Sequence, residues 1–182
     1  MHDVLERYLE VIRKELRTLK RQADKALAQV DDEAFFAQLD EESNSIAVIV
    51  KHMSGNLRSR WTDFLTSDGE KSGRHRDREF IIEEGDTRAA LTAGWEEGWK
   101  IVAESVAALS PVDLDKSVMI RSEPQPVIVA LERGLTHAAG HVGQLVLLAK
   151  HWSGPNWRTV SIAKGQSDAF NDKMKERHAT TK

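Results

Sequence analysis

The chain has 182 residues, of which 40% are hydrophobic, and this suits one domain over residues 1–182 with a sizeable core. It contains no cysteine, which excludes structural disulfides, thiolate metal sites and a cysteine nucleophile. The formal net charge is −3 with acids and bases interspersed, so the composition indicates neither a nucleic-acid nor a membrane partner. Because the start, MHDVLERYLE, is charged and amphipathic, we expect that it is not a signal peptide and that the protein is cytoplasmic.

Residues 5–30 predict a long amphipathic helix. Their apolar residues step alternately by four and three, the spacing of a seam in a helical bundle: Leu5, Leu9, Ile12, Leu16, Leu19, Ala23, Ala26 and Val30. A polar connector follows over residues 31–45, with one apolar pair, Phe35–Phe36. Ser45 is expected to cap a second helix that continues to about Leu65.

The second helix is followed by a long polar loop over residues 66–80. Four basic residues gather in this loop and could bind phosphate: Arg74, His75, Arg76 and Arg78. Asp77 and Glu79 interrupt the cluster, which argues against nucleic-acid binding.

A third helix is expected after Asp86, its predicted cap, and Pro111 marks its end. Residues 116–123 alternate weakly and predict a short strand or hairpin arm. The fourth helix follows, with apolar residues three and four apart: Ile128, Leu131, Leu135, Ala138, Val142, Leu145, Ala149 and Trp152. The tail, residues 156–173, is expected to lie on the helices, and the last few residues to fray. These patterns predict an all-α four-helix bundle with a short β element before the fourth helix.

Three histidines occupy the flanks of these predicted seams. His137 and His141 are four residues apart, so they lie on one face of the fourth helix and can reach one metal ion. His52, in the second helix, can supply a third ligand, and three protein ligands leave metal positions open. Alternatively, the histidines are ordinary polar residues hydrogen-bonded at the edge of the core. Ala138 stands where the HExxH pattern has its glutamate, so a metalloprotease of that type is not expected.

Three segments carry a resemblance to a known family: residues 45–71, 141–152 and 161–171. They contain His52 and the sequence HVGQLVLLAKHW, in which Gln144 follows the second histidine of the HxxxH pair by three residues. With that pair, the chain resembles the DinB-like (YfiT-like) superfamily of four-helix metalloproteins, and within it a branch of unknown function. The spacer Ala138–Gly140 departs from that branch, where aromatic residues are frequent.

The resemblance implies an up-down-down-up bundle with one long crossover between the second and third helices. It implies that His52, His137 and His141 bind a divalent metal, zinc or nickel, and that the protein is a homodimer. Characterised members of the superfamily join bacillithiol, mycothiol or glutathione to electrophiles, or isomerise maleylpyruvate. A low-molecular-weight thiol cosubstrate and a small-molecule electrophile are therefore expected.

Three functions remain open at this point. The first is a metal-dependent thiol S-transferase, or a related hydrolase or isomerase, with Asn56, Asp63 and Gln144 as candidate pocket residues. Its general base is not assigned, although Asp63 and Glu104 are candidates. The second is a metal-binding or stress-associated protein without catalysis. The third is a metal-free helical dimer that acts as an interaction module.

Overall fold

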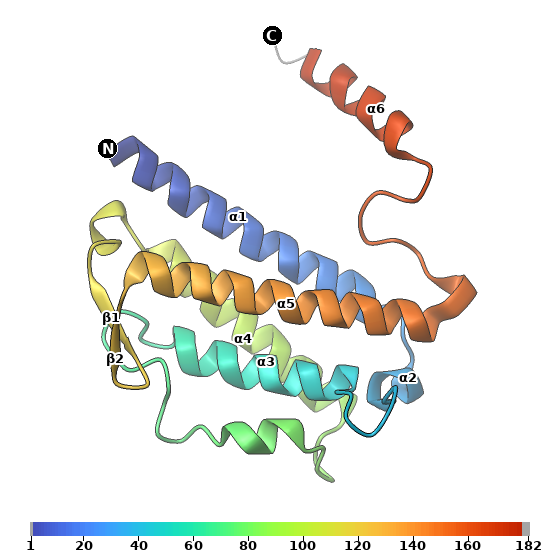
Figure 1. The fold of residues 1–182 in the computed structure, drawn as a ribbon, viewed down its shortest axis with the longest axis horizontal. Helices are drawn as coiled ribbons and strands as arrows, with labels where there is room; N and C mark the ends of the chain where they lie inside the picture. The colour runs from blue at the N-terminus through green and yellow to red at the C-terminus, as the bar shows by residue number, and fades with distance from the viewer. Residues whose placement is uncertain (1, 180–182) are drawn as a thin grey trace.

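The computed structural model describes residues 2–179 and is mostly helical (Figure 1). Within this range there are six α-helices: α1 (His2–Leu27), α2 (Asp32–Phe36), α3 (Ile46–Trp61), α4 (Arg88–Ala108), α5 (Val127–Ser153) and α6 (Ser167–Ala179). Two antiparallel strands, β1 (Ser117–Ile120) and β2 (Glu123–Pro126), form a hairpin before α5. Three short 3-10 helices complete the elements: η1 (Arg76–Phe80), η2 (Pro111–Asp113) and η3 (Gly154–Asn156).

The four long helices pack in pairs around one apolar core. α1 lies along α5 and α3 lies along α4, and further contacts join α1 to α4 and α3 to α5. α1 and α5 run in one direction, and α3 and α4 run in the opposite one (Figure 1). Residues 62–87 therefore form a crossover that returns the chain to the start of α4. None of the described helices is both long enough and apolar enough to cross a membrane.

The seam predicted for the first helix is confirmed up to Leu27, where α1 ends, whereas Val30, the last residue of the predicted seam, is buried but lies beyond the helix. Leu9, Ile12 and Leu16 are buried in the core, and Ala23 and Ala26 continue the same face. Burying such a stripe is the main source of stability for a helix of this kind, because isolated helices are marginal in water.

The start of α3 is predicted correctly and its end is not. The Ser45 hydroxyl accepts a hydrogen bond from the backbone N–H of Val48 at 3.2 Å, as a helix cap does. The helix ends at Trp61 instead of Leu65, because Asp63 adopts a left-handed conformation with φ of 50°. Aspartate tolerates this region better than most residues do, and Asp63 is exposed on the turn that follows the helix.

Two capping predictions need correction in the connecting segments. The third long helix is capped by Thr87, whose hydroxyl accepts from the N–H of Ala90 at 3.2 Å, and not by Asp86. Asp86 instead accepts a hydrogen bond from Lys51 at 2.6 Å. The polar connector over residues 31–45 contains the unpredicted α2, which Asp31 caps and which buries Phe35.

The hairpin confirms a strand within residues 116–123 and adds a second arm that was not predicted. That arm carries Pro124 and Pro126, opposite Met119 and Ser117 respectively. Proline has no N–H to donate, so it is tolerated on the edge of a sheet, as in this two-stranded hairpin. Val118 and Ile120 are buried, which docks the hairpin onto the ends of the long helices.

The tail lies on the helices for only part of its length. Trp157 and Val160 pack against the core, and the N–H of Arg158 donates to Gln29 at 2.7 Å. From residue 161 to residue 173 the side chains are exposed and α6 projects from the other helices (Figure 1), so the expected docking is wrong there. The helix has no continuous apolar stripe to bury. Fraying was expected at the last few residues, and residues 180–182 lie outside the described range.

Candidate metal centre

Three imidazoles from two helices meet at one point. His52 projects from α3, and His137 and His141 project from adjacent turns of α5. Nε2 of His52 lies 3.4 Å from Nε2 of His137, and one nitrogen from each ring falls within 4.8 Å of the others. Two nitrogens bound about 2.1 Å from a tetrahedral ion stand about 3.4 Å apart, so the spacing fits a metal with small side-chain adjustments.

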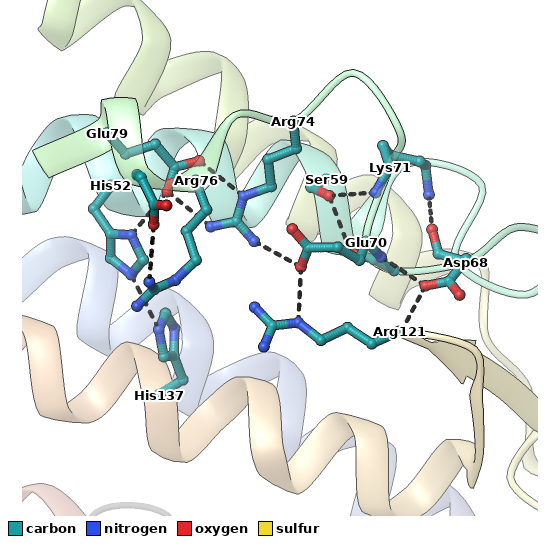
Figure 2. A network of polar contacts seen from close by, with 12 residues as sticks. His52, Ser59, Asp68, Glu70, Lys71, Arg74, Arg76, Glu79, Arg121 and His137 are labelled. Carbon is teal, nitrogen blue, oxygen red and sulfur yellow. Dashed lines mark hydrogen bonds and ion pairs between the residues drawn. The ribbon is translucent and has the colours of Figure 1, made fainter.

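A buried carboxylate orients His52. Nδ1 of His52 donates to Oε2 of Glu79 at 2.9 Å, and both side chains are almost completely buried (Figure 2). This bond places the proton on Nδ1 and leaves the lone pair of Nε2 facing the other two histidines. A carboxylate behind a ligating histidine is a common partner in metal sites, because it fixes the tautomer and raises the basicity of the ligand.

Arg74 keeps Glu79 ionised. Nε and Nη2 of Arg74 donate to the two carboxylate oxygens of Glu79, each at 2.8 Å. Burial by itself raises the pKa of Glu79, but the hydrogen bonds from Arg74 and His52 outweigh it and bring the pKa below its ordinary value. Glu70 accepts from Arg74 and from Arg121, so an unbroken chain of polar contacts leads from His52 to the hairpin (Figure 2).

The two histidines of α5 are held in the form that binds metals. Burial, followed by the nearby charges of His141 and His52, lowers the pKa of His137 to about 4. Burial also lowers the pKa of His141, whose Nδ1 donates to Oε1 of Gln144 at 2.9 Å. Both rings are therefore neutral at neutral pH, and His141 presents an unprotonated Nε2.

A cavity of about 590 Å³ opens beside the three histidines. Asn56, which the sequence suggested as a pocket residue, is buried and lines this cavity. Gln144 does not line it and contacts His141 from outside, whereas Asp63 is exposed on the turn after α3. Glu104 is also remote, on the exposed face of α4, where it pairs with Lys100.

Sequence reasoning missed Glu79, although the chain contains a signal for it. Glu79 looked like a residue that merely interrupts a basic loop. Its carboxylate sits against Gly55, one turn beyond His52, at a position where any side chain would collide with it. A glycine one turn from a candidate ligand can mark the close approach of another chain segment. The four basic residues of this loop do not stay together as one cluster: Arg74 and Arg76 line the cavity, whereas His75 and Arg78 do not.

Replacing Glu79 by glutamine is expected to weaken zinc or nickel binding by about 10–100-fold, the usual cost of losing an outer partner of a ligating histidine. Glutamine keeps the shape but removes the charge that Arg74 and His52 share. Isothermal titration of the metal-free protein measures the effect. Glu83→Gln is the control, because Glu83 is exposed and pairs with Arg78 away from the histidines. Equal affinities in the two variants would show that Glu79 does not support the ligand set.

Comparison with known proteins gives a family and no close relative. Neither a search of curated proteins nor a search of solved structures returns a match. A family model described as "Protein of unknown function (DUF1572)" matches residues 3–166, which contain the three histidines and end just before α6. The match covers well over half of the chain, so the protein belongs to the DUF1572 family.

Proposed function

We propose that His52, His137 and His141 bind a divalent transition metal, and that the protein is a metal-dependent enzyme acting on small molecules, most simply a thiol S-transferase. The observation that carries this proposal is the convergence of three imidazole nitrogens beside a cavity. Placement supports it too, since the three ligands come from the second and fourth long helices, as in the DinB-like superfamily. We assign the chain to that superfamily and its helices to an up-down-down-up bundle as part of the same proposal.

The donor set suits zinc or nickel. All three candidate ligands are imidazoles, which are favoured by zinc, nickel, copper and iron, whereas magnesium and calcium prefer oxygen. Two of the three rings have Nδ1 engaged, by Glu79 and by Gln144, so their Nε2 atoms are fixed as the ligating nitrogens. A divalent metal held here would supply a Lewis acid that lowers the pKa of a thiol or of water.

The cavity favours an enzyme over a metal store. A store needs ligands and no space for an organic molecule, whereas a small-molecule site is usually a concave pocket of about 300–1,000 Å³. The volume of about 590 Å³ lies within that range. Asn56 places an amide in the cavity wall one turn from His52, where it can orient a substrate by donating and accepting hydrogen bonds.

The test is to titrate untagged, metal-free protein with zinc and nickel and then to assay it with thiols. Each chain is expected to take up one ion. The loaded protein should then consume glutathione or bacillithiol in the presence of an electrophile such as 1-chloro-2,4-dinitrobenzene, faster than the metal-free protein does. Absence of metal uptake would overturn both the metal site and the metal-dependent enzyme. Uptake without thiol transfer would remove the transferase and favour a non-catalytic metal protein.

A further inference from the structure

The cavity beside the histidines is strongly basic. Its lining contains five arginines, namely Arg60, Arg74, Arg76, Arg121 and Arg133, and one acidic residue, Glu70. The chain as a whole carries a formal charge of −3, so this concentration of positive charge is local and not a property of the composition. A low-dielectric pocket lined by one sign of charge attracts ions of the opposite sign.

Three of these arginines already have partners. Arg74 is engaged by Glu79 and Glu70, and Arg121 lies 3.4 Å from the same oxygen of Glu70. Arg76 lies over the ring of Phe80, with its centre 5.0 Å from the ring centroid. These contacts hold the three side chains in place, so each of them has a structural role in the cavity wall.

No comparable contact gives Arg60 or Arg133 a structural role. Within residues 2–179 neither guanidinium group makes a hydrogen bond or an ion pair with another residue, although the main-chain carbonyl of Arg133 accepts from Thr136, and Nη1 of Arg60 is buried without a partner. Burial lowers the pKa of Arg60, and the positive charge of Arg133 is the next largest cause. Guanidinium groups stay protonated in proteins, so half-buried Arg60 and exposed Arg133 bring two positive charges to the lining of one cavity. Glu70 raises the pKa of Arg60, but by less than Arg133 lowers it. An anion bound between the two guanidinium groups would relieve their repulsion and give the buried Nη1 of Arg60 an acceptor.

Arg60 and Arg133 continue the four-residue spacing of the candidate ligands along α3 and α5. On α3, His52, Asn56 and Arg60 are four residues apart and form one stripe along the helix. On α5, Arg133, His137 and His141 form a second stripe with the same step. Because the two helices are antiparallel, the histidine ends of the stripes meet at one end of the cavity and the arginine ends meet at the other.

We propose that Arg60 and Arg133 bind an anionic group of the substrate, a carboxylate or a phosphate, while the rest of the molecule extends past Asn56 to the three histidines. The identification of this ligand as a substrate rests on the proposed function, but the anion site itself does not. Guanidinium presents a planar fork of donors that matches carboxylate and phosphate oxygens in pairs. His52 and Arg60 are eight positions apart on α3, a rise of about 12 Å along the helix axis. The substrate is therefore elongated, with its anion at one end and its reacting group at the other.

The proposal is tested by calorimetric titration at low ionic strength with two probes, inorganic phosphate and succinate, on both metal-free and metal-loaded protein. Saturable binding of at least one probe is expected, and the preferred probe identifies phosphate or carboxylate as the anion. Arg60→Gln and Arg133→Gln should each weaken it at least about 10-fold, the loss expected for a charge-assisted bidentate pair. Arg58→Gln is the matched control, because Arg58 lies on the same helix, pairs with Glu97 and does not line this cavity.

The outcomes separate the two proposals. Arg60→Gln and Arg133→Gln proteins should still take up zinc or nickel like the wild type, because neither arginine is a ligand. If the wild type takes up no metal but binds the anion, the metal enzyme fails and the anion site stands. If neither probe binds saturably, or if both arginine variants bind it as the wild type does, the anion site is overturned. Should Arg60→Gln fail to fold, Arg133→Gln decides the matter, because Arg133 is exposed and its replacement leaves the core intact.

Discussion

Replacing His141 by alanine is expected to abolish stoichiometric binding of zinc or nickel, with a loss of affinity greater than about 100-fold. Loss of an outer hydrogen-bond partner of a ligand alone lowers metal affinity about 10–100-fold, and His141→Ala removes a candidate ligand outright. His141 is only partly buried, so alanine opens no large cavity in the core and the metal-free protein should unfold at nearly the wild-type temperature. Metal content after dialysis, together with thermal unfolding with and without added metal, measures both effects.

His151→Ala is the matched control for this variant. His151 lies on the same helix but is exposed, and its ring packs edge-on against Trp152, away from the three-histidine cluster. It should bind zinc or nickel as the wild type does. If His141→Ala retained full metal binding, the ion would have to be held elsewhere, and the three-histidine site would be refuted.

Replacing Trp61 by alanine is expected to lower the free energy of unfolding by about 3–5 kcal/mol, the usual cost of emptying a buried aromatic site. Trp61 is 1% exposed, stacks on Phe64 and ends α3 against α5. A typical domain is stable by only about 5–15 kcal/mol, so this single change removes a large share of the total. Denaturant unfolding followed by circular dichroism measures it, and a loss below about 1 kcal/mol would contradict the packing of Trp61 against Phe64 and Gly134.

The partner of Trp61 across the interface is Gly134. A Cβ atom placed at Gly134 would lie 2.7 Å from Cζ2 of Trp61, so Gly134→Ala should also destabilise, by about 1–3 kcal/mol through overpacking. In the double variant the alanine at 134 meets no indole, so the two losses of unfolding free energy should not add. Strict additivity would show that the two residues do not contact each other in solution. Gly143→Ala is the control, because a Cβ atom there meets nothing within 4 Å.

The parts of the fold that were predictable are those governed by a repeating spacing. The seam from Leu9 to Ala26 and the cap at Ser45 follow from helical periodicity and from an N-cap preference. The same periodicity placed His137 and His141 on one face of a helix and His52 on another. Their convergence then required only that the two helices be neighbours, which a small helical domain readily provides.

The other residues of the site come from the crossover, where the sequence has no repeating spacing from which to predict the structure. The contacts that Glu79 and Arg74 make are determined by how residues 62–87 fold back on α3, and composition does not determine that path. Adjacent residues with similar capping ability, Asp86 and Thr87, could not be distinguished by preference alone. Helical spacing extends the second predicted helix four residues too far, to Leu65, and so predicts a helical face for Asp63, which lies on the turn after α3.

The distance in sequence between the histidines links the site to the folding of the whole chain. His52 and His137 are separated by 85 positions, and between them lie the crossover, α4 and the hairpin. In the unfolded chain His52 is far from the His137–His141 pair, so an ion held by all three imidazoles would stabilise the native form, by about 2.7 kcal/mol when its free concentration is 100 times the dissociation constant. Scarcity of that ion would then shorten the life of the folded protein, and the amount of protein in a cell would follow the supply of the metal.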